Sequence, residues 1–255
     1  MKILKIIVSF SLFLLILFLL VWAGIKTNHQ TCTDISVIIH APKNSQLLSK
    51  SDVLHLLKQN NKEWQGKTIV EIEPAAIHKI LAQENYIKSV DKIHFLGAKL
   101  QIEVTLHDIL LEIIPTKGEK FLIDVDGIYL PYSPKTGNDI ITVTGNIPHN
   151  FQKKKTITPE NKELYEIFKL ASLLKTDPFY AALFHKIVLN EKQELVLHPT
   201  VGNLPVLFGN MQDAENKLMI LKYMYHDVLP YMSENKYAQL DVRFKNRIVA
   251  TKTKS

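Results

Sequence analysis

Hydrophobic and polar positions divide the chain into an apolar N-terminal run and a longer part with alternating patterns. Residues 6–25 form an uninterrupted run without a charged side chain, preceded by Lys2 and Lys5. As a helix, this run would span roughly 30 Å, the thickness of the hydrocarbon core of a bilayer. Lysines in front of such a run stay in the cytoplasm. We therefore expect a transmembrane helix over residues 6–25 and a cytoplasmic stub over residues 1–5.

A cleaved signal peptide is the alternative interpretation of this run. Signal peptides have a shorter apolar region, of roughly 7–15 residues, followed by a cleavage site with small side chains. Val21-Trp22-Ala23 resembles such a site only weakly. The length of the run favours a retained single-pass anchor in the inner membrane. The N-terminus would then lie in the cytoplasm, residues 26–33 would form a linker, and the bulk of the chain would be periplasmic.

The next stretch has the periodicity of a small mixed domain of helices and strands. Residues 34–40 alternate between apolar and polar side chains, as in a half-buried strand. Ser49 and Asp52 have the spacing of a helix-capping pair, and Pro74 suits the first turn of a second helix. Further strands are predicted over residues 86–95 and 100–106. The predicted order is β-α-α-β-β.

The second part of the chain combines short strands with longer helices. Asp124-Val125-Asp126-Gly127 separates two apolar runs and is a strong hairpin signal. Apolar residues recur at helical spacing between residues 158 and 174, and again between residues 214 and 228, where Pro230 ends the pattern. This mixture predicts an α/β domain and, for the whole chain, an α+β fold class.

The last predicted element is a C-terminal hairpin. Leu240, Val242 and Phe244 alternate with other residues, and Lys245-Asn246 precedes residues 248–250, which would pair back. An exposed strand edge presents N–H and C=O groups that can pair with another chain. Basic residues around the outer strand suit an ordinary protected edge equally well, so the pattern alone leaves both interpretations open.

Composition limits the classes of function. The formal net charge is +6; without Lys2 and Lys5, 29 basic residues remain against 25 acidic ones, or +4. This mild excess is typical of solvated surfaces and also suits contact with anionic lipid headgroups. Since the expected anchor places these residues outside the cytoplasm, we expect no nucleic-acid partner. The single cysteine, Cys32, excludes an internal disulfide and leaves a free thiol or an intermolecular bridge.

The sequence carries no complete motif for catalysis, metals or cofactors. Gly66-Lys67-Thr68 resembles the end of a phosphate-binding loop, but Asn61 stands where that loop needs glycine. The histidines are dispersed, without the spacing of metal ligands. The adjacent pairs His107-Asp108 and His226-Asp227 are expected to point apart. We therefore expect no cofactor, no metal site, no catalytic residue and no enzymatic activity.

Short motifs along nearly the whole chain resemble the FtsQ/DivIB family of bacterial cell-division proteins. In the first part, the β-α-α-β-β order and Ile72-Glu73-Pro74 are similar to the POTRA domain of that family. In the second part, the motifs resemble FtsQ proteins of Bacteroidetes-like bacteria. They include Ile123-Asp124-Val125-Asp126-Gly127, Leu197-His198-Pro199-Thr200-Val201-Gly202, Leu207-Phe208-Gly209-Asn210 and Leu240-Asp241-Val242-Arg243-Phe244. Their order and spacing together carry the resemblance.

The resemblance implies a fold and an organisation. The α+β chain would have one N-terminal transmembrane helix, a POTRA domain, and a mixed α/β "β domain" that ends in the C-terminal hairpin. The expected parts are a stub (1–5), a transmembrane helix (6–25), a linker (26–33), the POTRA domain (34–107), the β domain (108–252) and a tail (253–255).

The resemblance also implies a function. FtsQ-like proteins are non-enzymatic scaffolds at the division septum that link the small coiled-coil proteins FtsB/DivIC and FtsL to the septal peptidoglycan synthesis proteins FtsW and FtsI. Carried over to this chain, the partner-binding residues are Arg243 and Phe244 on the penultimate strand, and Ile248, Val249 and Ala250 on the outer strand. Backbone pairing at the edge would supply affinity, and alternate side chains would supply selectivity.

Two other functions stay open as alternatives. One is a POTRA-containing periplasmic chaperone or transport component, which would carry a cleaved signal. The other is a membrane-anchored cell-wall enzyme, which would release muropeptides.

Overall fold

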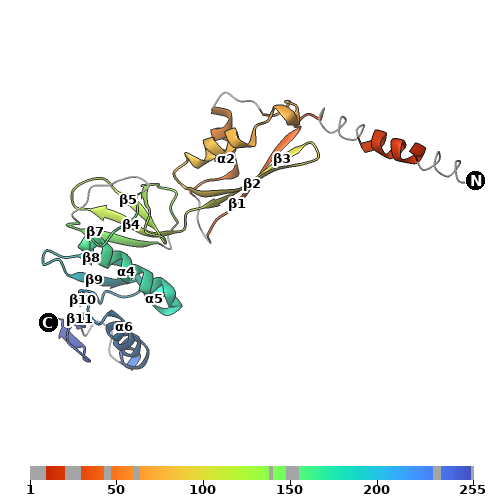
Figure 1. Cartoon of the computed structure of the whole chain (residues 1–255). Helices are drawn as coiled ribbons and strands as arrows, with labels where there is room; N and C mark the ends of the chain where they lie inside the picture. Colours follow the sequence, from red (N-terminus) through yellow and green to blue (C-terminus); the bar gives the residue numbers. More distant parts are fainter. Residues whose placement is uncertain are drawn as a thin grey trace, which may run out of the picture. The chain divides into compact units, whose positions relative to one another are not determined.

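The structure is a computed structural model with mixed α+β secondary structure (Figure 1). It describes residues 10–20, 30–42, 47–59, 64–137, 140–147, 155–231 and 237–253. The chain divides into two compact units. Unit 1 contains residues 1–40 and 48–106, and unit 2 contains residues 41–47 and 107–255. The α+β class predicted from the sequence is confirmed for the described residues.

The predicted transmembrane helix is wrong. Within residues 6–25, the structure describes a helix over residues 10–20, and residues 6–9 and 21–25 lie outside the described part. Eleven residues of helix extend roughly 16 Å, about half of a hydrocarbon core. None of the helices in the described ranges is long and apolar enough to cross a membrane. This finding overturns the transmembrane helix in the predicted fold class.

The predicted localisation depended on that helix. The single-pass inner-membrane location, with a cytoplasmic N-terminus and a periplasmic bulk, is therefore wrong as well, because the described residues contain no helix that could cross a membrane. The expectation that nucleic acid is not a partner loses the argument on which it rested.

Unit 1 contains a three-stranded sheet with two helices. Strands β1 (Asp34–His40) and β2 (Ile87–Leu96) flank β3 (Lys99–Leu106), which runs parallel to β1 and antiparallel to β2. Helices α2 (Lys50–Gln59) and α3 (Pro74–Ala82) and the 3-10 turn η1 (Ile69–Glu71) connect β1 to β2 (Figure 1). The predicted β-α-α-β-β order is confirmed. One face of the central strand is fully buried at Leu100, Ile102, Val104 and Leu106.

Local hydrogen bonds explain where unit 1 begins its helices. The N–H of Ser49 donates to Asp52 Oδ2 at 2.9 Å, and the N–H of Asp52 donates to Ser49 Oγ at 3.2 Å. This reciprocal pair satisfies two N–H groups at the start of α2, as the sequence predicted. Pro74 occupies the first turn of α3. Cys32 is a buried free thiol, so an intermolecular disulfide would require unit 1 to open.

Unit 2 is built on a nine-stranded mixed sheet within the described residues. Its order is β12 (Val249–Lys252), β11 (Tyr237–Asp241), β10 (Val206–Gly209), β9 (Leu195–Pro199), β8 (Phe184–Leu189), β7 (Ile141–Gly145), β4 (Ile109–Pro115), β5 (Phe121–Asp124) and β6 (Tyr129–Pro131). The hairpin predicted at residues 124–127 joins β5 to β6, and a second hairpin at residues 190–193 joins β8 to β9.

Strand β4 was missed by the sequence analysis. It lies inside the sheet, parallel to β7 and antiparallel to β5, and Ile109, Leu110, Leu111 and Ile113 are all buried. A strand that is buried on both faces has a continuous run of apolar residues, without alternation between apolar and polar residues. The two-residue periodicity that revealed the half-buried strands was therefore absent here.

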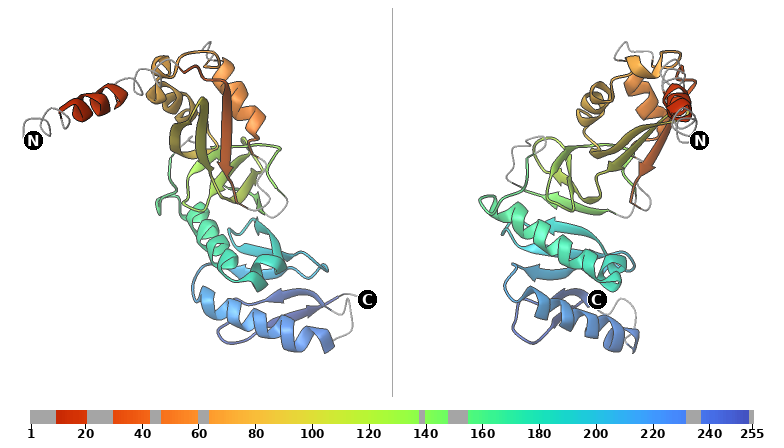
Figure 2. Two further views of the ribbon diagram at one scale, coloured as in Figure 1. Left: turned by 90° about the vertical axis from the view of Figure 1, so that its right-hand side faces the viewer. Right: turned by 45° about the vertical axis from the view of Figure 1, so that its right-hand side comes forward.

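Among the described residues of unit 2, helices α4 (Lys162–Thr176) and α6 (Ala214–Tyr223) lie on the same face of the sheet (Figure 2). Between them is the short helix α5 (Pro178–Leu183). The helical spacing predicted from residue 158 becomes helix only at Lys162, because Asn161 Oδ1 accepts the N–H of Leu164 and caps the helix there. Helix α6 continues as a π-helical turn (Met224–Val228) and a 3-10 turn (Leu229–Tyr231).

A buried polar pair supports the β5–β6 hairpin. His107 Nδ1 and Asp124 Oδ2 lie 2.6 Å apart, and both side chains are almost fully buried. Asp124 Oδ1 also accepts the N–H groups of Asp126 and Ile128 across the turn. His107 thus pairs with Asp124 and not with its neighbour in sequence.

The second adjacent pair differs from expectation. His226 Nδ1 and Asp227 Oδ1 lie 2.8 Å apart on the exposed π-helical turn. Neighbouring side chains were expected to point apart, as they do in a regular helix, but residues 224–228 depart from α-helical geometry.

Candidate functional site

Strand β12 forms one edge of the unit 2 sheet. It pairs antiparallel with β11, with Ala250 opposite Leu240 and Val249 opposite Asp241. Among the described residues no further strand pairs with it. The predicted C-terminal hairpin is therefore confirmed, and it leaves one side of β12 open. We refer to residues 242–252 as the C-terminal edge.

Within the C-terminal edge, residues 248–251 alternate between partly buried and exposed side chains. Ile248 and Ala250 are partly buried and pack against the hydrophobic core of unit 2. Val249 and Phe244 are 43% and 41% exposed, respectively. The core contacts of Ile248 and Ala250 hold β12 in place, while the apolar side chains of Val249 and Phe244 remain exposed at the surface.

Arg243 and Phe244 lie in the connection between the last two strands, not on the penultimate strand where the sequence placed them. Strand β11 ends at Asp241. There Asp241 Oδ1 accepts the N–H of Arg243 at 3.0 Å, which turns the chain locally. Asn246, with φ 57°, then occupies the left-handed region of the turn predicted at Lys245-Asn246.

The ring of Phe244 makes a cation–π contact with Arg247. The guanidinium of Arg247 lies 5.1 Å from the centroid of the Phe244 ring. The N–H of Arg247 donates to the carbonyl of Phe244 at 3.4 Å, which brings the two residues together across the turn. Asn246 Oδ1 accepts from Asn216 Nδ2 at 2.9 Å and so connects the turn to α6.

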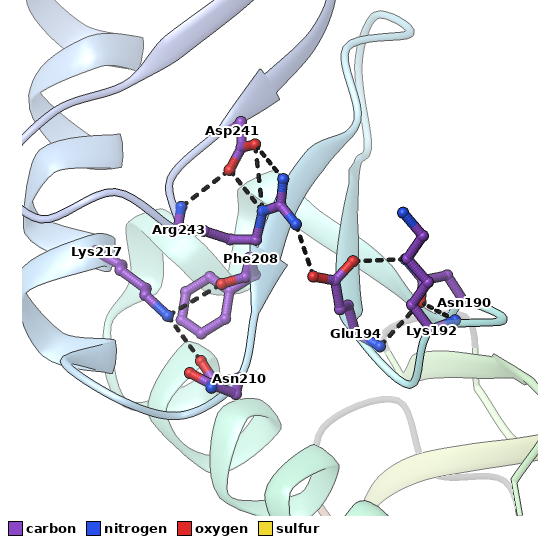
Figure 3. Close-up of polar contacts among 8 residues, drawn as sticks. All are labelled: Asn190, Lys192, Glu194, Phe208, Asn210, Lys217, Asp241 and Arg243. Carbon is purple, nitrogen blue, oxygen red and sulfur yellow. Dashed lines mark hydrogen bonds and ion pairs between the residues drawn. The ribbon is translucent and has the colours of Figure 1, made fainter.

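Arg243 is held by two carboxylates (Figure 3). Its Nη2 donates to Asp241 Oδ2 at 2.7 Å, and its Nε lies 3.0 and 3.2 Å from the two oxygens of the same carboxylate. Its Nη1 donates to Glu194 Oε1 at 2.7 Å. Glu194 is fixed in turn by Asn190, whose Nδ2 donates to Glu194 Oε2. We refer to Arg243, Asp241 and Glu194 as the arginine cluster.

The arginine cluster shifts the pKa values of its members. Burial is the largest single influence and would raise the pKa of Asp241 and of Glu194. The hydrogen bonds and positive charge of Arg243, together with smaller contributions from neighbouring groups, outweigh it in sum, and both pKa values lie below their usual range. Hydrogen bonds to Asp241 and then to Glu194 raise the pKa of Arg243. All three groups are therefore charged at neutral pH.

Lys217 lies beside this cluster with its side chain buried (Figure 3). Its Nζ donates to the carbonyls of Phe208 and Asn210, at 3.1 and 2.8 Å, and lies 4.9 Å from the centroid of the Phe208 ring. Burial lowers the pKa of Lys217. The ammonium group thus satisfies two carbonyls at the end of β10.

A cleft of about 630 Å³ adjoins the C-terminal edge. It is lined by residues from α4, the β8–β9 hairpin, α6 and the chain after β11, among them Glu166, Glu194, Lys217, Arg243 and Phe244. Its lining contains five lysine or arginine residues and four aspartate or glutamate residues, so it has no strong preference for one sign of charge. Over the described ranges, no group of three or more His, Cys, Asp or Glu residues could hold a metal ion.

The structure brings together some of the predicted partner-binding residues. Val249 lies opposite Asp241, whose carboxylate holds Arg243. Phe244 is not part of this group; its ring contacts the guanidinium of Arg247. The sequence analysis missed Asp241, Glu194 and Lys217. Asp241 and Arg243 are two residues apart, and this spacing could have indicated their ion pair. Glu194 lies 49 residues from Arg243, so the sequence gave no sign of that contact.

The class of protein is defined by the two units together. A POTRA-like domain matches residues 30–105, and the domain described as FtsQ/DivIB, C-terminal related, matches residues 110–251. No curated protein gives a match. The second domain covers more than half of the 255 residues, and the chain therefore belongs to the FtsQ/DivIB family through its C-terminal related domain.

The family assignment confirms the resemblance found in the sequence. It supports a role in cell division and, in general terms, partners within the division complex. Both domain families are non-catalytic scaffolds. The matches name no specific partner and do not address a membrane or periplasmic location.

Proposed function

We propose that this protein is a non-enzymatic scaffold of the cell-division complex, and that β12 accepts a strand from a small coiled-coil protein of the FtsB/DivIC type. Residues 34–107 and 108–252 would act as its POTRA and partner-binding domains. The scaffold would link the FtsB/DivIC-type protein and FtsL to the septal peptidoglycan synthesis proteins FtsW and FtsI.

The open side of β12 is the observation that carries this proposal. An edge strand offers unsatisfied N–H and C=O groups to an added strand. Val249, Thr251 and Lys252 are exposed on β12, and the apolar surfaces of Val249 and Phe244 would contact the partner. Ile248 and Ala250 would act indirectly, by fixing the strand on the core.

Two proline variants test the pairing. Successive N–H groups of a strand point to opposite sides, so Val249→Pro and Ala250→Pro remove one donor that faces β11 and one that faces the open edge. We expect the variant that loses the open-edge donor to abolish co-purification with the FtsB/DivIC-type protein while unit 2 stays folded. Val249→Ala keeps the N–H donor and loses only apolar surface, so it should weaken co-purification without abolishing it. Normal co-purification by both folded proline variants would contradict strand addition.

Two further measurements test the surface and the cellular role. Phe244→Ala should weaken partner binding about tenfold, whereas Val201→Ala, at an 83% exposed apolar residue outside the C-terminal edge, should not change it. A fluorescent fusion should concentrate at midcell in dividing cells. A uniform distribution would count against a role in division.

A further inference from the structure

The attachment of the last hairpin to the rest of the sheet is short. Only two residue pairs, Val206 with Leu240 and Leu207 with Asp241, define the parallel pairing of β10 and β11. The N–H of Leu240 donates to the carbonyl of Pro205 at 3.0 Å, and the N–H of Val242 donates to the carbonyl of Leu207 at 3.1 Å. Among the described strands, β12 pairs with β11 alone, so its backbone position depends on this small ladder as well as on the core contacts of Ile248 and Ala250.

The side chain of Arg243 crosses the end of β10 and strengthens the attachment of β11 to the sheet. Its guanidinium joins Asp241 at the end of β11 to Glu194 at the start of β9, although β10 lies between these strands. The aliphatic part of Arg243 crosses Gly209 at the end of β10, where an added Cβ would come within 2.8 Å of Arg243 Cγ. One side chain thus spans three neighbouring strands (Figure 3).

The charges argue against Arg243 as a direct contact for an acidic partner. Asp241 and Glu194 supply two negative charges to one guanidinium, so the arginine cluster carries a formal charge of −1. Each of the three guanidinium nitrogens already donates to a carboxylate. A carboxylate from a partner would approach an arginine already neutralised by two carboxylates, whose negative charges would repel it.

We propose that Arg243 is a positioning residue, which holds the β11–β12 hairpin against β9 and β10 so that the open edge of β12 is formed before a partner arrives. This inference rests on the proposed function of β12 as a strand-accepting edge. Pre-organisation lowers the ordering cost of binding, so the cluster would influence affinity without a contact across the interface.

Hydrogen exchange of the full-length protein alone tests the positioning. Arg243→Met keeps the aliphatic stem and removes the charge, and Glu194→Met removes the acceptor on β9. We expect each variant to speed exchange of the Leu240 and Val242 amides about tenfold, and the double variant to add little, because both break the same connection. Lys245→Met, at an exposed basic residue of the same loop, should leave exchange unchanged. Unchanged exchange in both single variants would overturn the inference.

Affinity for the FtsB/DivIC-type protein separates this inference from the proposed function. If Arg243 acts by position, Glu194→Met should weaken binding about as much as Arg243→Met, roughly tenfold, although Glu194 lies three strands from β12. Weaker binding by Arg243→Met alone, with normal amide exchange, would show a direct contact and overturn positioning. If the unmodified protein does not bind at all, the proposed function fails, while the exchange experiment still decides whether Arg243 fixes the hairpin.

Discussion

Arg243 packs directly against the backbone of Gly209, and the absence of a side chain there makes room for it: a Cβ at Gly209 would lie 2.8 Å from Arg243 Cγ and 3.1 Å from its Cδ. Gly209 also has φ +82°, a conformation that favours glycine. The close approach lets the arginine stem lie flat across the end of β10. Gly209 therefore helps to place the Arg243 guanidinium between the carboxylates of Asp241 and Glu194.

Gly209→Ala should destabilise unit 2 through both effects. The backbone conformation costs about 1 kcal/mol for alanine, and the displaced arginine adds to that cost. Gly202→Ala is a matched control, because Gly202 has φ +80° with nothing within 4 Å of an added Cβ. Urea unfolding should show a larger loss for Gly209→Ala, and the excess should vanish when Arg243 is also changed to alanine. Equal losses in the two glycine variants would contradict this relationship.

His107→Ala should destabilise unit 2 by about 3 kcal/mol, because it leaves Asp124 Oδ2 buried without its imidazole partner. His226→Ala removes a similar contact of 2.8 Å to Asp227, but on an exposed turn. Exposed pairs contribute at most about 1 kcal/mol, so this control should unfold almost as the unmodified protein does. Denaturant midpoints of the two variants give the comparison. Similar values would mean that the buried pair is not an important support of the β5–β6 hairpin.

Acid should loosen the C-terminal edge. The pKa values of Asp241 and Glu194 are lowered in the folded protein, so their contribution to stability is fully present above the ordinary carboxyl pKa of about 4 and is lost as the pH falls through the folded values. Exchange of the Val242 amide should therefore quicken, relative to its intrinsic rate, as the pH falls below about 4. In Arg243→Met this acid-dependent change should be smaller. An equal pH dependence in both proteins would show that other carboxylates control the edge.

Much of the fold could be predicted from local patterns. The Ser49–Asp52 capping pair, Pro74 and the Asp124–Gly127 turn act over a few residues, and each is found in the structure. Strand β4 escaped prediction because burial on both faces removes the alternation on which strand assignment relied. The N-terminal run misled because hydropathy was converted into a full membrane span, whereas the structure describes helix over residues 10–20.

The candidate site was predictable only in part. The edge position of the last hairpin follows from its alternation and turn residues, and the structure agrees. The pairing of Arg243 with Glu194 and the burial of Lys217 depend on strand order, which brings the β8–β9 hairpin beside the end of β11. A one-dimensional pattern does not contain that order. The role assigned to Arg243 changed accordingly, from a contact at the interface to a support behind it.

The brevity of β12 has a consequence for how long a complex would last. Four residues offer on the order of two to four backbone hydrogen bonds to a visiting strand, each with a net value of about 1 kcal/mol. Such a ladder alone would be released quickly, so a durable assembly needs simultaneous contacts elsewhere. The same brevity discourages two copies of this protein from joining edge to edge. A short edge strand therefore suits a complex that forms and dissociates reversibly.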